Sequence, residues 1–277
     1  MDYYYLIASL PELSLEQPFP SIDVDNTLSF ITGNLNEEDL KLSKYLIFPN
    51  DNKNLTNSIL DKYHKITLAE YKSPSNFSGE DILASLMQGN LYNAPNYMLR
   101  YIANYKDKFD LLRPSRIEEY LWLEFYSELE TLDNTFIIEY YQFDKTLRQL
   151  ATVRNSQLYD DSPLSEFVND AINRQLEISK PETVLAKTYP FISDLWSALD
   201  GRDPLTIEKT MDRIRWKFID EYELYENFSS NQVFGWIIKL VHYSRWASLS
   251  SEKGRIRCLE LCDNALKVSG ISELENL

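Results

Sequence analysis

The segment 136–150, FIIEYYQFDKTLRQL, decides the fold class, because its apolar residues return at alternating steps of four and three. One narrow seam along a single α-helix then carries Phe136, Tyr140, Phe143, Leu147 and Leu150. Other helices have to cover this seam, since apolar side chains gain free energy when they leave water. The segment therefore predicts a long helix packed within a group of helices.

Start and stop signals on both sides of this segment extend the helical pattern. Ser78 and Asp81 form part of a capping box ahead of a helix that should end near Gly89. Further start signals stand at Pro95, Pro114, Ser162–Pro163 and Asp203–Pro204, a stop signal stands at Gly201, and apolar helical runs follow at 233–246 and 256–266. No long segment alternates with the period of two that a half-buried strand needs. We expect an all-α fold of about ten helices.

Three stretches interrupt the helical pattern. Three prolines between Pro11 and Pro20 predict an extended arm, and the stretches 49–57 and 73–78, rich in Asn, Ser, Pro and Asp, are expected to be loops. No change of composition marks a domain boundary. The chain 1–277 is therefore expected to form a single helical domain, and it would divide, if at all, near 159–162 and 200–204.

The charge balance and the cysteines bound the class of protein. With 43 acidic and 28 basic residues the net charge is −15, which excludes nucleic acid as an expected partner. The sequence contains no apolar run long enough to span a membrane and no basic region ahead of the first apolar residues, so we expect a cytoplasmic protein. Cys258 and Cys262 share one helix face and are expected in the core, since a metal site would need two further ligands nearby.

Motifs that carry chemistry are missing from the sequence. The seven glycines never stand at the spacing of a phosphate-binding loop, and His64 and His242 lie far apart and outside any metal-binding pattern. No G-x-S-x-G nucleophile motif exists. We therefore predict no catalytic residue, cofactor or metal. An enzyme with an unrecognised carboxylate pair is the remaining alternative, and it would need a deep pocket holding acids of raised pKa.

The charges are unevenly distributed along the chain. From Ser115 to Asp144 eight acids face one base, a net charge of −7, whereas from Gly235 to Leu259 five bases face one acid, a net charge of +4. The basic stretch is either a solvated face or a docking surface for an acidic partner or an anionic membrane boundary. If it docks a partner, the candidate residues are Lys239, Arg245, Trp246, Lys253, Arg255 and Arg257, with Trp246 as a core residue or a contact.

Three segments carry a resemblance to a known family. They are MDYYYLIASLPEL at 1–13, FDKTLRQLATVRN at 143–155 and RIRWKFIDEYELYENFSSNQVFGWIIKLVHYSRWASLSSEKGR at 213–255. Together they look like a bacterial family whose members resemble the C-type subunit of V-type and A-type rotary ATPases. The resemblance implies a funnel of helices that links the central stalk to the membrane rotor ring and does no chemistry.

Two functions therefore follow from the sequence. The first is a non-catalytic coupling subunit of a V-type ATPase or ATP synthase, engaged in proton or ion transport. Its partners would be the central-stalk subunits and the rotor ring, and it would lie in the cytoplasm, held to the inner face of the membrane through the complex. The alternative is a helical adaptor or scaffold protein unconnected with ATPases. Only the identity of the partner separates these two functions.

Overall fold

The computed structural model describes residues 3–16, 19, 21–66, 71–88, 94–159, 182–226 and 228–249, and the separate positions 252, 254–256, 258, 259 and 262. Every regular element within these ranges is a helix, so the predicted all-α fold of about ten helices is confirmed. The predicted start at 162–163 and most of the predicted helix at 256–266 lie outside the described residues.

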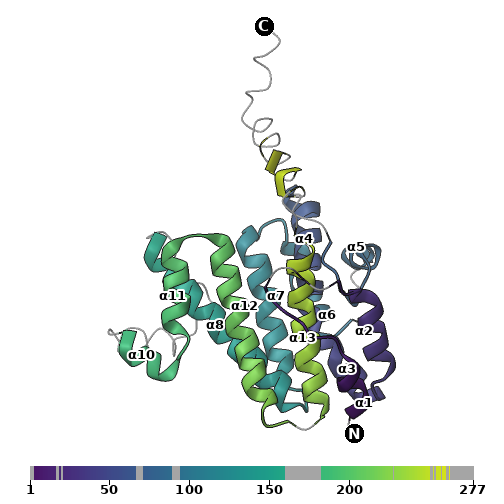
Figure 1. Cartoon of the computed structure of the whole chain (residues 1–277). Coiled ribbons are helices and arrows are strands. Elements are labelled where there is room, and N and C mark those ends of the chain that lie inside the picture. The colour runs from purple at the N-terminus through teal and green to yellow at the C-terminus, as the bar shows by residue number, and fades with distance from the viewer. Residues whose placement is uncertain are drawn as a thin grey trace.

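The first half of the chain forms short helices and the second half longer ones. The short elements are α1 (Tyr4–Ser9), α2 (Val24–Gly33), α3 (Glu37–Ser43), η1 (Lys44–Leu46), α4 (Phe48–Ile59), η2 (Leu60–His64), α5 (Gly79–Gln88), α6 (Asn96–Tyr105) and η3 (Lys106–Lys108). The later helices are α7 (Pro114–Leu129), α8 (Thr135–Tyr159), α10 (Glu182–Thr188), α11 (Ile192–Gly201), α12 (Pro204–Glu223) and α13 (Ser230–Ala247). Figure 1 shows α12 and α13 side by side, with α10 and α11 on one flank and α1 to α5 on the other.

Local signals placed the helix boundaries well. Ser78 and Asp81 form a reciprocal capping box, since the Asp81 amide donates to Ser78 Oγ at 3.1 Å and the Ser78 amide donates to Asp81 Oδ2 at 3.2 Å. Asp203 accepts a bond from the Thr206 amide at 3.0 Å ahead of Pro204, where α12 begins. Such signals need only neighbouring residues, so a sequence reveals them.

The prediction of a loop at 49–57 is wrong, because these residues belong to α4. Pro49 stands in the first turn, where its missing N–H has no helical partner to lose. The Asn and Asp side chains that suggested a loop are used across space to hold the segment 72–77. Asn54 exchanges two hydrogen bonds with the Lys72 backbone, at 2.7 and 3.0 Å, and Asp51 accepts bonds from the amides of Asn76 and Phe77. The segment 73–78 itself is non-helical, as predicted.

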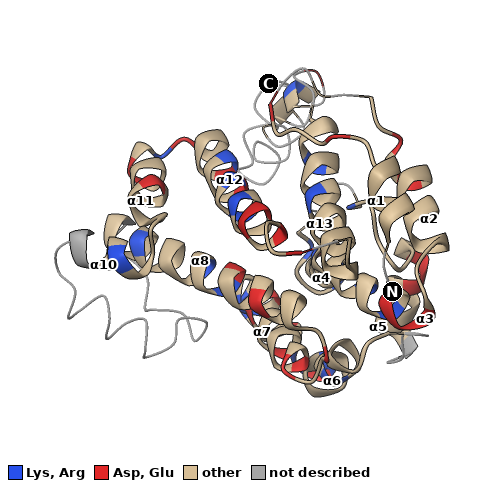
Figure 2. Cartoon of the chain, turned by 60° about the horizontal axis from the view of Figure 1, so that its bottom comes forward, with Lys and Arg blue, Asp and Glu red and all other residues tan. Residues whose placement is uncertain are grey.

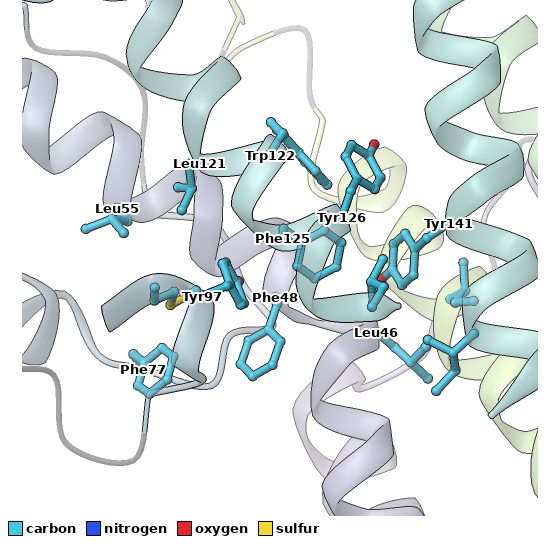
Figure 3. Packing of buried hydrophobic residues seen from close by; sticks show 14 of the residues in the cluster. Leu46, Phe48, Leu55, Phe77, Tyr97, Leu121, Trp122, Phe125, Tyr126 and Tyr141 are labelled. Carbon is cyan, nitrogen blue, oxygen red and sulfur yellow. The ribbon is translucent and has the colours of Figure 1, made fainter. Parts of the chain in front are cut away.

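A large aromatic core joins α1 to α7 with the adjoining ends of α8, α12 and α13. Figure 3 shows how its rings pack around Phe125, which lies edge-on to Tyr97 at 5.2 Å and to Tyr141 at 5.0 Å between ring centroids. Phe48 continues the set through an edge contact with Tyr97 at 5.9 Å. Edge-to-face pairs of this kind stabilise the fold beyond the contribution of the buried apolar area. The abundance of Tyr and Phe is therefore used mainly inside the protein.

A smaller apolar cluster lies between the second half of α8, the first half of α12, α10 and α11. Leu147 and Leu150 of the predicted seam belong to it, whereas Phe136 and Tyr140 belong to the large core. The seam is thus buried except at the half-buried Phe143, and its two halves face different clusters. The change from one cluster to the other falls within α8 and α12. Division of the chain near 159–162 or 200–204 stays a prediction.

The helices α12 and α13 approach closely at Gly235. A Cβ atom placed there would lie 2.7 Å from Ile219 Cγ2 and 2.5 Å from Glu223 Oε1. Ile219 is fully buried and has no room to retreat. The glycine therefore permits a contact that any side chain would prevent.

We predict that Gly235→Ala lowers the free energy of unfolding by about 1–2 kcal/mol, because overpacking outweighs the gain in helix propensity. Chemical denaturation measures the change. Gly201→Ala is the matched control, since nothing lies within 4 Å of its Cβ position, and it should be neutral or stabilising. Equal effects of the two substitutions would contradict the close approach.

Asp51 predicts a pH dependence of stability. Burial raises its pKa to about 7, although Asn76 and Phe77 donate hydrogen bonds to it. An unfolded Asp has a pKa near 4, so the folded state holds a proton that the unfolded chain releases, and the associated stability is lost as the pH rises from about 4 through 7. Relative to Asp51→Asn, the free energy of unfolding of the wild type should fall by about 2 kcal/mol between pH 5 and pH 8. Parallel pH profiles of the two proteins would show that Asp51 is ionised throughout.

Candidate functional site

A chain of charged side chains, buried at its centre and partly exposed at both ends, crosses the boundary between the two apolar clusters. Its members are Arg148, Asp144, Arg215, Asp212 and Arg245, and we name it the buried charge chain. Arg215 Nε donates to Asp144 at 2.7 Å and its Nη1 donates to Asp212 at 3.0 Å. The second oxygen of Asp144 accepts from Arg148 Nε at 2.7 Å. These bonds join the middle of α8 to the middle of α12.

The charge chain continues to α13 at one end and to α7 at the other. Asp212 accepts hydrogen bonds from Arg245 and, at 2.7 Å, from the Trp246 indole N–H, and Arg245 also pairs with Glu208 at 2.7 Å. The Arg148 guanidinium lies 4.1 Å from the centre of the Trp122 ring on α7. Four helices therefore meet through one continuous set of polar contacts.

The electrostatics of this set keep both carboxyl groups ionised. Burial alone would raise the pKa of Asp212, but the positive charges of His242, when protonated, Arg215 and Arg245 outweigh it and lower this pKa. The pKa of Asp144 is also lowered, since Arg148 and Arg215 outweigh its burial. Burial lowers the pKa of His242 to about 4, so its Nδ1 is free at neutral pH to accept the Trp216 indole N–H. None of these three groups titrates near neutral pH, where a general acid or base is most effective.

The predicted docking residues are mostly engaged within the chain. Lys239 pairs with Asp220 at 2.6 Å and Glu223 at 3.0 Å, and only 12 % of its side chain is exposed. Arg245 and Trp246 belong to the contacts around Asp212, with Trp246 buried in the core. Arg255 is exposed and pairs with Glu252 at 2.8 Å. Lys253 and Arg257 lie outside the described residues. Whether these six residues bind a partner stays a prediction.

The neighbouring cysteines differ from expectation. Cys258 and Cys262 are both exposed, so the prediction that they lie in the core is wrong. Their spacing fixed a shared helix face, but it could not reveal whether other helices cover that face.

The acidic stretch is likewise joined to distant bases. Glu118 pairs with Lys53 at 2.9 Å, and Arg100 reaches both Glu124 at 3.1 Å and Glu128 at 3.0 Å. Figure 2 shows acidic positions along α7, basic positions along α13, and both kinds along α12. The two charge blocks of the sequence are therefore used in large part for internal ion pairs, with partners from other parts of the chain.

A surface that the sequence did not indicate lies at one end of the molecule. It consists of Tyr4 and Tyr5 on α1 and of Leu224, Tyr225 and Phe228 at the turn between α12 and α13, and we name it the aromatic end surface. Tyr5 and Tyr225 are each 88 % exposed and Leu224 is 78 % exposed. The Tyr4 and Phe228 rings meet at 4.5 Å. Figure 1 shows the two segments together at the lower end of the view, beside the N-terminus.

Hydrogen bonds hold the two segments of the aromatic end surface in place. The Tyr3 amide donates to the Phe228 carbonyl at 2.7 Å, and the buried Tyr3 hydroxyl donates to Asp39 at 2.6 Å. Phe228 stands in the left-handed region, at φ 54°, where its amide donates to Gln232 at 3.0 Å. The run Tyr3-Tyr4-Tyr5 was a usable signal, since three consecutive aromatic residues on a helix cannot all face one core.

Metal-binding clusters and membrane-spanning helices are both missing from the part of the chain that the structure describes. The described residues contain no group of three or more His, Cys, Asp or Glu side chains placed to hold a metal ion. Among the helices for which positions are given, none is long and apolar enough to cross a bilayer.

The fold and these contacts define an all-α protein of many helices, in which the buried charge chain connects four helices and the aromatic end surface is exposed. Its sequence, over residues 1–267, matches the model of a family described as "Protein of unknown function (DUF2764)". The chain belongs to this family. No curated protein and no solved structure matches it.

The resemblance to a rotary ATPase component, the C-type subunit of the V-type and A-type enzymes, is corrected by this assignment. The match extends over nearly the whole chain and is to DUF2764, and no match indicates that ATPase component. The described parts of the quoted segments are largely helical, and Ile219, Phe234 and Tyr243 from them are buried. Amphipathic spacing of this kind is shared by helical proteins in general.

Removal of a charge from the buried charge chain should be costly. We predict that Asp212→Ala lowers the free energy of unfolding by about 3–5 kcal/mol, because Arg215 loses one of its two buried partners. The Asp212 side chain is only 1 % exposed, so water cannot replace it. The control is Glu252→Ala, which breaks the exposed pair with Arg255 and should leave the stability nearly unchanged. A loss of less than about 1 kcal/mol for Asp212→Ala, measured by chemical denaturation, would contradict the prediction.

Proposed function

We propose that this protein is a non-catalytic helical adaptor that binds a protein partner through the aromatic end surface. The observation that carries the proposal is the gathering of five large apolar side chains, all at least partly exposed, where α1 meets the turn between α12 and α13. Burial of one such side chain contributes about 1.5–3 kcal/mol. Several together are enough to hold a complex.

The hydrogen bonds that order this surface favour binding. An interface that is already ordered loses little conformational entropy when a partner arrives, so more of the burial energy appears as affinity. Tyr3 and Phe228 supply this order through the backbone bond between them and through the bond from Tyr3 to Asp39. Aromatic residues on such an ordered surface are the side chains most often found at the energetic centre of protein interfaces.

The charges around the surface favour a protein over a lipid or a nucleic acid. The exposed Glu37 and Glu38 open α3, beside Asn36, whose amide donates to the Tyr3 hydroxyl. Figure 2 shows acidic positions on α3, close to the N-terminus. Glu226, within the turn itself, accepts hydrogen bonds from Ser229 and Asn231. Carboxylates repel phosphate groups, whereas they attract basic side chains at the rim of a protein interface.

The chemistry and the location of the protein complete the proposal. A non-catalytic role is supported by the engagement of Asp144, Asp212 and His242 in the contacts described above. A cytoplasmic location stays a prediction from the sequence. The coupling role in a rotary ATPase, with its stalk and rotor-ring partners and its peripheral place at the membrane, was predicted from the resemblance. It loses that support with the family assignment and stays an untested prediction.

Substitution of the two most exposed tyrosines tests the proposal. We expect the double variant Tyr5→Ser/Tyr225→Ser to keep its fold and to lose at least about tenfold in partner recovery, because each ring adds more than 1.4 kcal/mol of burial. The measurement is affinity purification of the tagged full chain from its native cells, with quantitative mass spectrometry of what accompanies it.

The matched control is Leu111→Ser, because Leu111 is 79 % exposed and lies in the turn before α7. The opposite end of α7 is the one that leads to Asn134, which donates to Asn231 beside the end surface. Its recovered partners should equal those of the wild type. Circular dichroism melting of both variants separates lost binding from lost folding. Full partner recovery with the double variant, or equal loss with Leu111→Ser, would exclude the aromatic end surface as the binding site.

A further inference from the structure

A separate groove of about 540 Å³ lies between α8 and α12 and is bounded at one side by the residues 188–191 that join α10 to α11. It shares no residue with the aromatic end surface. Its volume falls within the range of binding clefts in proteins.

The floor of the groove is apolar. Phe143 of α8 and Phe218 of α12 stack at 4.4 Å between ring centroids, and Phe191 meets Phe143 edge-on at 5.4 Å. Ile214 is buried, and all four residues line the groove. Each of the three phenylalanines is only half-buried, so apolar surface is left open to water on this face. A partner that covered these rings would gain the free energy of their burial.

The walls of the groove are acidic on both sides. Glu139 lies on the α8 wall and Glu221 on the α12 wall, and both are exposed. Lys217 also lines the groove, but it stands 3.9 Å from Glu221, with both side chains more than 60 % exposed. A pair as open as this is weak and can rearrange around an incoming charge. The walls therefore suit a ligand that carries positive charge at two places.

We propose that this groove binds a basic amphipathic helix of another protein. Leu or Phe side chains on one face of that helix would cover the three phenylalanine rings, while Lys or Arg side chains beside them would pair with Glu139 and Glu221. A helix is the fitting shape, because the groove runs between two helices and apolar anchors at steps of three and four match such a cleft. Together with the aromatic end surface, the groove gives the protein two distinct sites, as a scaffold that joins two partners requires.

The test uses a defined probe, because the partner helix is unidentified. The probe is a fluorescein-labelled 18-residue peptide of Leu and Lys, with Leu at positions i, i+3, i+4 and i+7, and its reference is the same peptide with Glu in place of Lys. Fluorescence anisotropy against the full chain should give saturable binding of the basic peptide and at least tenfold weaker binding of the acidic one. Equal binding of both peptides would overturn the proposal.

Two groove variants locate the binding site. Glu139→Gln/Glu221→Gln removes the wall charges and leaves the core untouched, and Thr146→Trp fills the floor and leaves the charges in place. Each should weaken binding of the basic peptide at least tenfold. If Thr146→Trp does not fold, the charge variant still decides the question. Unchanged binding with Glu139→Gln/Glu221→Gln would overturn the proposal.

Control variants separate this site from the end surface. Asp107→Asn/Asp110→Asn removes the same number of exposed charges outside both proposed sites, and Tyr5→Ser/Tyr225→Ser alters the end surface. Both should bind the basic peptide as the wild type does, and an equal loss with either would overturn the groove as its site. Sedimentation velocity tests whether a second copy of this chain fills the groove instead. If the wild type forms a dimer and Glu139→Gln/Glu221→Gln does not, the groove binds a second copy of the chain and the proposal is overturned.

Discussion

The contacts of Arg215 with Asp144 and Asp212 hold the architecture together. A buried guanidinium is expensive to desolvate, and this cost is offset only when its partners stand in place. The contacts therefore fix how α8 and α12 align, because a shift of one helix by a single turn would move Arg215 about 5 Å from Asp144. The apolar clusters on either side tolerate many packings, whereas the charge chain accepts one.

The buried charge chain also explains why both apolar clusters can share the helices α8 and α12. In α8 the large core ends at Tyr141 and the smaller cluster begins at Leu147, with Asp144 between them. In α12 the order is reversed around Arg215, since Ile214 belongs to the smaller cluster and Ile219 to the large core. Each helix thus serves two cores and changes from one to the other at a charge.

The sequence predicted what depends on near neighbours and missed what depends on distant ones. Helix starts at Ser78 and Pro204 followed from caps within three residues, and the all-α class followed from periodicity. The loop expected at 49–57 failed because Asn54 bonds to Lys72, eighteen positions away. For the same reason the sequence shows the charges of Lys239 and Glu118 but does not reveal which residues form ion pairs with them. The end surface needs two segments that only the folded chain brings together.

The backbone conformation of Phe228 lowers the stability of the turn at the end surface. A residue other than glycine in the left-handed region costs on the order of 1 kcal/mol, and glycine would occupy the same turn without strain. Glycine, however, would remove the ring that meets Tyr4. The chain therefore keeps a strained turn together with a ring that packs against Tyr4 and is 38 % exposed. Backbone strain is therefore a second feature, beside the exposed rings, that distinguishes this turn as a candidate binding site.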